Sequence, residues 1–332
     1  MASLPSQLKR FADRDLLSEI EKDLERVESL LLANTKHVDP VLQEAARHLL
    51  AAGGKRVRPV LVLLAARLGD GVTDRVLDAA AVVELTHLAT LYHDDVMDDA
   101  PTRRGVPTAQ HVYGNSRAIL IGDLLLARAS KLSVELGIDA IRLQAKTFER
   151  LCVGQLNEAV VPSADRAIEH YISVLADKTG SLIATSAVLG AQIANAAVEY
   201  QTALSEFGEK IGVAFQLIDD VIDISEAGPS GKTPGTDLRA GVPTMPVLLL
   251  RQAAVASPEA AELLARIDGD LTSDADLAAV VKALREHPVA DAAYAEAVRW
   301  GNEAIAALDV LPDSPTKRAL IHFAEKVVER DN

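Results

Sequence analysis

Two aspartate clusters are the residues of this chain whose type and spacing most clearly allow chemistry. They occur as HDDVMDD and LIDDVID, each within an apolar stretch. Residues four apart on a helix share one face, about 6 Å apart, so Asp94 pairs with Asp98. Asp219 and Asp223 form a second pair by the same spacing. Without neighbouring cysteines or several histidines, such carboxylates favour magnesium over zinc. One cluster alone could be a solvated acidic patch, but two in apolar helices make that interpretation weak.

A glycine-containing basic motif, GGKRVRP, directly precedes another apolar stretch. Pro59 suits the first position of a helix, so the loop before it brings Lys55, Arg56 and Arg58 to a helix N-terminus. Helix N-termini bind anions through their unpaired N–H groups, and the two glycines would let the backbone approach the anion. The alternative interpretation is a basic turn on the surface.

The formal net charge of the 332 residues is −14. Nucleic acid is therefore not an expected partner, because the basic residues that neutralise phosphates are outnumbered. An anionic ligand must instead be held by a local basic cluster. Besides GGKRVRP, the pair Arg103 and Arg104 follows the first aspartate cluster, where it could grip the same phosphate as the metal.

The composition and the spacing of apolar residues predict an all-α fold. Hydrophobic residues make up 49% of the chain and aromatic residues only 3%, and alternation long enough for a sheet is absent. Apolar residues recur three and four apart in the predicted helices, which span 16–32, 60–68, 74–93, 116–136, 139–160, 167–195, 197–224 and 244–255. Turns are predicted at 160–165, 257–258 and 269–276.

Residues 226–243 are rich in Gly and Pro, and they predict a long loop that is either a functional lid or disordered. No stretch resembles a linker, so we expect one domain spanning residues 1–332. The N-terminus has no apolar signal region and no later run of about 18 apolar residues lacks charge, which predicts a cytoplasmic protein without a transmembrane segment. Cys152 is the only cysteine, so a disulfide framework is excluded and we expect a small core residue.

Five segments, taken together, resemble the trans-isoprenyl diphosphate synthases of the polyprenyl synthetase family. They are GGKRVRP, ELTHLATLYHDDVMDDAPTRRG, GDLLLARA, DKTGSL and FQLIDDVID, in this order from about residue 50 to 250. The stretch SGKTPGTDLRAGVPT further resembles actinobacterial members. The resemblance implies a single large helical bundle with a central metal-diphosphate site, two or three Mg²⁺ ions and a homodimer.

The resemblance also implies roles for individual residues. Those expected to bind isopentenyl diphosphate are Lys55, Arg58, His87 and Arg104. Those expected to bind the allylic diphosphate are Arg103, Lys178 and Lys232. The expected metal ligands are Asp94, Asp98, Asp219 and Asp223. The remaining catalytic residues are Asp95 and Asp220 of the aspartate motifs, and Thr179 and Gln216, which would face the developing cation.

The implied reaction condenses isopentenyl diphosphate with an allylic diphosphate to give a trans-polyprenyl diphosphate, and the released pyrophosphate would take up the proton. Ala89 and Thr90 lie one turn before the first aspartates, with Thr86 a turn further. Their small size resembles long-chain enzymes, so we expect a heptaprenyl to decaprenyl product for a quinone side chain, with peripheral membrane contact on release. The alternatives are a farnesyl or geranylgeranyl diphosphate synthase, a non-catalytic subunit of a heteromeric synthase and, ranked low, a terpene cyclase.

Overall fold

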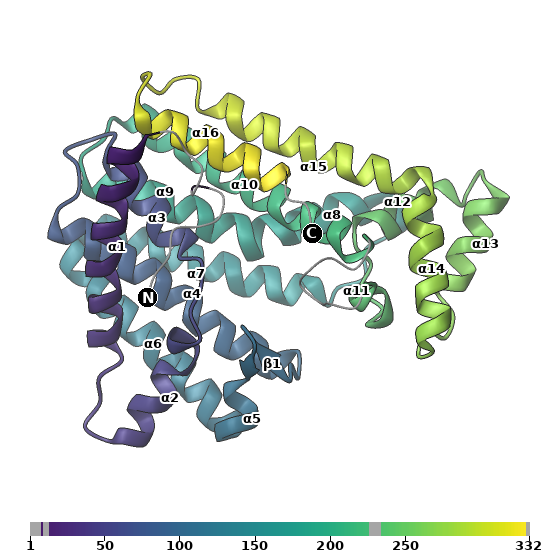
Figure 1. The fold of residues 1–332 in the computed structure, drawn as a ribbon, viewed down its shortest axis with the longest axis horizontal. Coiled ribbons are helices and arrows are strands. Elements are labelled where there is room, and N and C mark those ends of the chain that lie inside the picture. The colour runs from purple at the N-terminus through teal and green to yellow at the C-terminus, as the bar shows by residue number, and fades with distance from the viewer. Residues whose placement is uncertain (1–7, 9–12, 226–233, 330–332) are drawn as a thin grey trace. The chain divides into compact units, whose positions relative to one another are not determined.

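The computed structural model describes residues 8, 13–225 and 234–329, and this part of the chain is almost wholly helical (Figure 1). The all-α prediction is confirmed. The elements, in chain order, are α1 (Arg14–Asn34), α2 (Pro40–Ala51), α3 (Val57–Ala66), α4 (Asp74–Met97), β1 (Thr102–Arg103), β2 (Val106–Pro107), α5 (Ala109–Tyr113), α6 (Asn115–Leu136), α7 (Ile138–Glu158), η1 (Ala164–Arg166), α8 (Ala167–Leu175), η2 (Ala176–Gly180), α9 (Ser181–Ile193), α10 (Val198–Asp223), α11 (Thr236–Arg239), α12 (Met245–Ala253), α13 (Pro258–Ile267), α14 (Asp274–Glu286), α15 (Pro288–Ala307) and α16 (Pro315–Val328).

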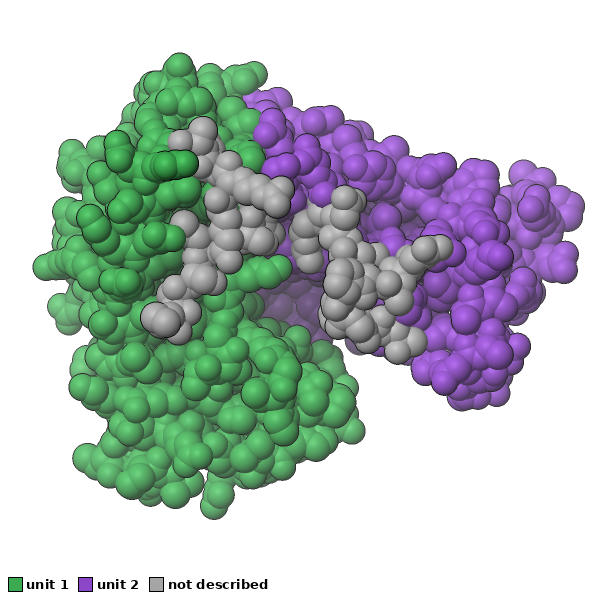
Figure 2. Space-filling view, in the orientation of Figure 1, with its two compact units in different colours: residues 1–149, 182–208, 307–323 green, residues 150–181, 209–306, 324–332 purple. Residues whose placement is uncertain are grey.

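The chain divides into two compact units (Figure 2). Unit 1 comprises residues 1–149, 182–208 and 307–323, and unit 2 comprises residues 150–181, 209–306 and 324–332. The first aspartate cluster and GGKRVRP belong to unit 1, whereas the second aspartate cluster belongs to unit 2. The single domain expected from the sequence stays a prediction.

Helix α4 is the central element of unit 1. It contacts α1, α3, α5 and α6, and nearly every side chain from Val76 to Ala89 is buried. A helix that is apolar on all sides is buried on all sides. Its closest neighbour is α6, because a Cβ on Gly122 would lie 2.3 Å from the His93 ring. The first aspartate motif therefore extends from the end of a firmly held helix.

Unit 2 places the second aspartate motif at the end of α10. Leu175 of α8, Leu217 of α10, Met245 of α12 and Ala297 of α15 belong to one apolar cluster. A second apolar cluster joins α12, α13 and α14. Helix α10 also approaches η2 closely, because a Cβ on Gly212 would lie 2.5 Å from the Gly180 Cα. These contacts hold η2 and the second aspartate motif within one packed group of helices.

The structure differs from the sequence-based predictions in several local details. The predicted helix 167–195 contains a wide π-helical turn, η2. Pro59 is the third residue of α3 rather than the first, because α3 begins at Val57. The predicted loop 226–243 contains the short helix α11, while Lys232 lies outside the described residues. Cys152 is exposed on α7 rather than buried in the core, because it lies on the outer face of that helix.

Within the residues that the structure describes, one helical stretch, Ala164–Ile193, is long and apolar enough to cross a membrane, with a mean hydropathy of 1.3 over 18 residues. Within that stretch, 61% of the window is buried inside the protein. Burial of this extent is ordinary for a core helix, since a membrane-spanning helix exposes its apolar side chains to lipid.

Candidate functional site

The first aspartate motif keeps helical spacing across the end of α4. The backbone N–H of Asp98 donates to the Asp94 carbonyl at 2.8 Å, and Asp98 still has right-handed helical dihedrals. Asp94 is partly buried and Asp98 is exposed. Asp99 then ends the helix with a φ of 47°. The predicted i, i+4 relation of Asp94 and Asp98 therefore holds, with one carboxylate at the surface.

Asp95 differs from its neighbours because it is fully buried. Its Oδ1 accepts a hydrogen bond from Arg103 Nε at 2.7 Å, and its Oδ2 is enclosed without a hydrogen-bond partner among the described residues. Burial raises the pKa of Asp95, although the Arg103 guanidinium opposes this shift. In this geometry Asp95 orients Arg103.

The hairpin of β1 and β2 separates the two adjacent arginines. Arg104 and Gly105 form its two-residue loop, with φ values of 56° and 78°, as in the primed turns that match strand twist. Arg103 reaches Asp95, whereas Arg104 Nη1 donates to the Leu49 carbonyl at 2.9 Å and to the Gly53 carbonyl. The two guanidiniums therefore have different partners, and their assignment to two different diphosphates stays a prediction.

The residues predicted to bind isopentenyl diphosphate gather in unit 1. Arg58 is partly buried, with its Nε enclosed and without a hydrogen-bond partner in the described part of the chain. Burial lowers the pKa of Arg58 to about 10, so its charge is kept at neutral pH. Burial and the charges of nearby arginines, including Arg58 and Arg104, hold the pKa of His87 well below its usual range. Lys55 is exposed in the same loop. Lys55, Arg58 and Arg104 offer three positive charges to an anion, and His87 offers a neutral imidazole.

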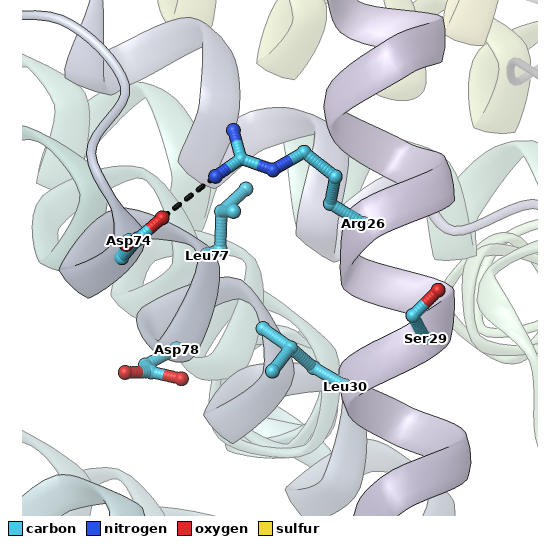
Figure 3. Close-up of a pocket in the computed structure, with 6 residues that line it drawn as sticks. All are labelled: Arg26, Ser29, Leu30, Asp74, Leu77 and Asp78. Atoms are coloured by element: carbon cyan, nitrogen blue, oxygen red, sulfur yellow. Dashed lines mark hydrogen bonds and ion pairs between the residues drawn. The ribbon is translucent and has the colours of Figure 1, made fainter.

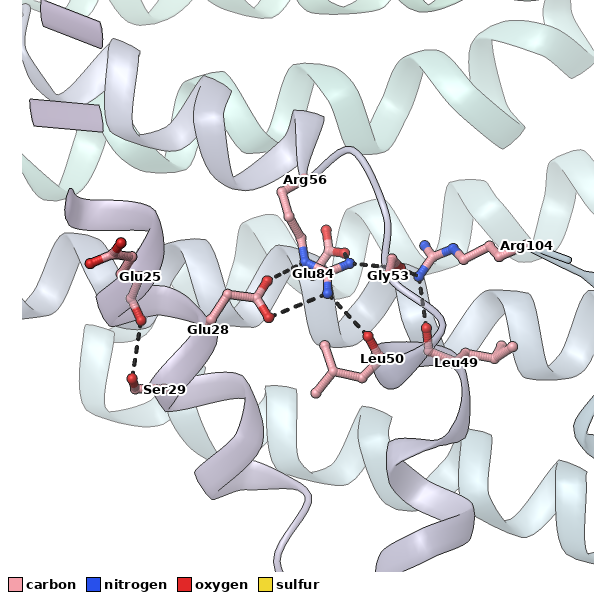
Figure 4. Close-up of polar contacts among 9 residues, drawn as sticks. All are labelled: Glu25, Glu28, Ser29, Leu49, Leu50, Gly53, Arg56, Glu84 and Arg104. Atoms are coloured by element: carbon pink, nitrogen blue, oxygen red, sulfur yellow. Dashed lines mark hydrogen bonds and ion pairs between the residues drawn. The ribbon is translucent and has the colours of Figure 1, made fainter. Parts of the chain in front are cut away.

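Arg56, the third cation predicted at the helix N-terminus, turns inward instead. It is the N-terminal cap of α3 with a φ of 49°, and its side chain is only 2% exposed. Glu28 and Glu84 pair with it (Figure 4). Arg56 is therefore part of the core beneath the basic loop.

In the second aspartate motif, Asp220 is the buried member. Its Oδ2 accepts hydrogen bonds from the Tyr171 hydroxyl at 2.7 Å and from the Met245 N–H at 3.0 Å. Burial raises the pKa of Asp220 to about 7, and both donors oppose that shift. Asp220 thereby joins α8, α10 and α12 directly beside Asp219.

Asp219 and Asp223 are partly buried at the end of α10. The Asp223 carboxylate accepts hydrogen bonds from the backbone N–H groups of Thr236 and Asp237, both at 3.2 Å, and so caps α11. A metal ion bound at Asp223 would share this carboxylate with the backbone of α11. The assignment of Asp223 as a metal ligand stays a prediction.

The turn η2 carries Lys178 and Thr179, which are partly buried, as is Gln216. Lys178 forms an ion pair with Glu158. Arg150 braces the turn through Asp177 and Glu209, donating to each at 2.6 Å. Wide turns of this kind occur often at functional sites. An allylic diphosphate at Lys178 would compete with the Glu158 carboxylate.

The carboxylates fit a magnesium ion better than a metal that needs a complete protein cage. No group of three or more His, Cys, Asp or Glu side chains in the described ranges could hold a metal ion by itself. Mg²⁺ usually keeps waters and takes one or two carboxylates together with substrate phosphates. Asp94 and Asp98, or Asp219, would supply such a partial set of ligands.

The three residues predicted to set product length lie in the buried part of α4. Ala89 and Thr86 are almost completely buried, and Thr90 is partly buried. Each threonine hydroxyl donates to a carbonyl of its own helix, Thr86 to Val82 and Thr90 to His87. Thr90 shares the face of Asp94, whereas Ala89 is turned about 140° away from it.

A separate pocket of about 310 Å³ lies between α1 and the start of α4 (Figure 3). Its lining residues are Arg26, Ser29, Leu30, Asp74, Leu77 and Asp78. An ion pair of 2.6 Å between Arg26 and Asp74 closes one side of it. No residue of the predicted site lines this pocket.

Sequence reasoning missed three residues that position the predicted ones: Glu28, Glu84 and Tyr171. The sequence does indicate a role for Glu84, because an acidic side chain within an apolar helix is expected to be buried and to need a positively charged partner. No such indication exists for Glu28 and Tyr171, since each meets its partner only through packing of distant helices.

Comparison with known proteins gives a consistent result. The family model described as polyprenyl synthetase matches residues 39–284. The chain is 42% identical over 311 residues to the nonaprenyl diphosphate synthase of Mycobacterium tuberculosis, covering 92% of this chain and 91% of that protein. It is similar to the geranylgeranyl pyrophosphate synthase of Corynebacterium glutamicum, solved with calcium and isoprenyl diphosphate, with a TM-score of 0.87, 43% identity and coverage of 96% and 98%. A decaprenyl diphosphate synthase from Rhodobacter capsulatus has a TM-score of 0.86 at 31% identity, covering 95% and 98%.

Proposed function

Because this chain belongs to the polyprenyl synthetase family and is a trans-prenyltransferase that condenses isopentenyl diphosphate with an allylic diphosphate, we propose that it is magnesium-dependent and makes a long-chain product. The observation that carries the placement of the two diphosphates is in unit 1. Arg58, His87 and Arg104 form an incompletely neutralised basic cluster, and the hairpin that positions Arg104 also aims Arg103 at the first aspartate motif.

The residues of the chain have distinct tasks in this reaction. Arg58, Lys55 and Arg104 hold the isopentenyl diphosphate, and the neutral His87 imidazole adds an N–H donor. Arg103 and Lys178 bind the allylic diphosphate and stabilise the charge that develops on it as the carbon-oxygen bond breaks. Bound magnesium supplies Lewis-acid stabilisation and a template for the same diphosphate, and Asp94, Asp98, Asp219 and Asp223 would hold it.

Thr179 and Gln216 present polar groups toward the allylic cation, and the apolar surroundings exclude the water that would quench it. The double bond of isopentenyl diphosphate then attacks the cation. Among the described residues none is assigned as a dedicated base, so the released pyrophosphate takes the proton. Lys232, whose predicted role is to close over the allylic diphosphate, lies outside the described residues.

The side chains of α4 support the product length better than the relatives do, because relatives of similar identity differ in their products. The Mycobacterium tuberculosis protein is a nonaprenyl diphosphate synthase, and the Corynebacterium glutamicum protein makes geranylgeranyl pyrophosphate by name. Ala89, Thr90 and Thr86 are all small, and none of them is an aromatic side chain that would close a pocket running along the helix. We therefore expect a heptaprenyl to decaprenyl product.

Incubation of the purified protein with isopentenyl diphosphate and a geranyl, farnesyl or geranylgeranyl starter tests the activity. Products are dephosphorylated and sized, with and without magnesium. We expect elongation to between seven and ten isoprene units that stops when the metal is chelated and resumes when magnesium is added back. A product of three or four units would establish the short-chain alternative. Elongation only after addition of a second protein would establish the heteromeric one.

Ala89→Phe tests the origin of product length. Because Ala89 is completely buried in α4, a phenyl ring there must enter the space beside the helix. We expect products shortened to three or four units, with the first condensation at nearly the wild-type rate. Ala89→Ser is the matched control and should leave product length unchanged. Thermal melting of both variants establishes that they fold, and a folded Ala89→Phe enzyme with full-length product would contradict the assignment.

The remaining expectations concern assembly and location. Helix α6 exposes Ile119, Leu120 and Val134, with 42%, 65% and 60% exposure. These exposed apolar side chains support the expected homodimer. A cytoplasmic location, transient contact with the membrane during product release and the absence of a nucleic-acid partner belong to the same proposal.

A further inference from the structure

The guanidinium of Arg56 has no donor left for a ligand. Its Nε and Nη2 donate to the Glu28 carboxylate, and its Nη1 donates to Glu84 at 3.1 Å. The remaining donors reach the carbonyls of Gly53 at 3.2 Å and Leu50 at 3.3 Å. Since an arginine has five N–H donors, these contacts use all of them. Although Arg56 stands between Lys55 and Arg58 in the sequence, it does not present a donor to an anion.

Arg56 and Arg104 meet at one carbonyl group. The Gly53 oxygen accepts from Nη1 of both arginines (Figure 4). Gly54 allows this approach, because a Cβ there would lie 2.5 Å from Arg56 Nη1 and 3.0 Å from the Arg104 guanidinium carbon. The path of the loop therefore depends on hydrogen bonds from the guanidiniums of Arg56 and Arg104. Of these two residues, Arg104 belongs to the predicted anion site.

The charges are arranged so that the core arginine is neutralised and the outer ones are not. The two carboxylates of Glu28 and Glu84 raise the pKa of Arg56 despite its burial, which by itself would lower it. Glu84 also attracts Arg58 and Arg104, but burial still lowers the pKa of both. Three guanidiniums thus share two carboxylates, and the unbalanced positive charge falls on the residues expected to meet a diphosphate.

Glu28 brings a helix from outside the recognised motifs into this arrangement. It lies on α1, is 20% exposed and contacts Arg56 through both carboxylate oxygens. Glu84 lies on α4, three residues before His87 and on the same face. The loop is therefore anchored to the first and fourth helices of the chain through a single side chain.

We propose that Arg56 is a positioning residue for isopentenyl diphosphate, and that Glu28 of α1 holds it in place. The Glu28–Arg56–Glu84 network presets the loop and Arg104 so that Lys55, Arg58 and Arg104 meet the diphosphate without reorganisation. This inference rests on the proposed assignment of that substrate to the basic cluster. Substrate binding to a preset site costs less free energy than binding that must first order the loop.

Arg56→Lys is the first test. Lysine keeps the charge but offers three donors from one atom, so it cannot hold both carboxylates and two carbonyls at once. We expect the KM for isopentenyl diphosphate to rise roughly tenfold or more, the scale of one lost charge-assisted hydrogen bond. The kcat and the KM for the allylic substrate should stay within about twofold, because neither depends on this loop.

Glu28→Gln is the milder test, for the case that Arg56→Lys does not fold. Glutamine keeps the shape and one acceptor, so we expect a smaller rise in the same KM alone. The double variant should raise that KM by less than the product of the two single effects, because the pair acts as one unit. Glu25→Gln is the matched control, since Glu25 is exposed on the same helix and points away from Arg56 in Figure 4. It should change nothing.

Arg58→Ala separates failure of this inference from failure of the proposed function. If Arg58→Ala raises the KM for isopentenyl diphosphate and Arg56→Lys does not, the positioning role is wrong and the site assignment stands. If Arg58→Ala leaves that KM unchanged, the site assignment fails and the positioning role fails with it. A folded Arg56→Lys enzyme with a strongly lowered kcat would show a general structural role and overturn the inference. An equal rise in the KM values of both substrates would overturn it as well.

Discussion

Asp94→Ala is expected to lower kcat by about a thousandfold or more, the scale of losing a principal stabiliser of transition-state charge. Asp219→Ala should have a comparable effect. Both carboxylates are partly buried at the ends of long, well-packed helices, α4 and α10, so their removal leaves the helices in place. Steady-state rates with saturating substrates and magnesium measure the effect, and circular dichroism and thermal melting establish folding.

Asp99→Asn is the matched control for Asp94→Ala. Asp99 belongs to the same cluster, is exposed and has a left-handed φ of 47°, which asparagine tolerates. The control removes one negative charge close to the motif and should change kcat by less than about threefold, because a screened surface charge has little effect. Nearly normal rates for a folded Asp94→Ala enzyme would rule out its role as a metal ligand.

Arg58→Ala is expected to weaken the binding of isopentenyl diphosphate far more than the binding of the allylic substrate. A hydrogen bond to a charged group contributes about 1.5–3 kcal/mol, which corresponds to roughly 10- to 150-fold in KM. The upper part of this range is expected, because the Arg58 guanidinium is partly enclosed and its Nε lacks a partner among the described residues. Initial rates with each substrate varied in turn give the two KM values.

Arg142→Ala is the matched control, since it removes the same charge from an exposed position on α7. Arg58→Lys should recover part of the affinity, because the charge returns without the planar fork. An equal rise in both KM values for Arg58→Ala would mean that the basic cluster serves the allylic diphosphate as well.

Helices α1, α4, α6 and α10 fall within a few residues of the predicted ranges, because apolar residues recur over long runs in each of them. The shorter helices α2, α13, α14 and α16 also carry buried apolar residues, but they were not predicted. The wide turn η2 could not be predicted, because it uses residues equally compatible with an α-helix. Its last residue, Gly180, packs closely against Gly212, which is distant in the sequence. Helix α15 also escaped assignment, because its buried positions are mostly alanine and glycine, which give a weak apolar stripe.

The candidate site could be predicted to the extent that its residues are contiguous in sequence. Both aspartate motifs could be predicted because their four-residue spacing places two carboxylates on one helix face. The basic loop could be predicted because it directly precedes a helix. The distinction between Asp94 and Asp95, or between Arg56 and Arg58, could not be made. Adjacent residues on a helix point about 100° apart, so only packing decides which one meets solvent and which one meets the core.

The wide turn η2 has a consequence for comparing this helix with an uninterrupted one. A π-type turn contains one residue more than an α-helical turn, and the stretch from Ala164 to Ile193 stays helical across it. The helix after this turn is therefore rotated by about 100° relative to an uninterrupted helix. A protein with the same helices but an unbroken segment here would therefore align with this chain only across a one-residue gap. Transfer of a role from Lys178 to its apparent counterpart, without that gap, would select a side chain on the wrong face.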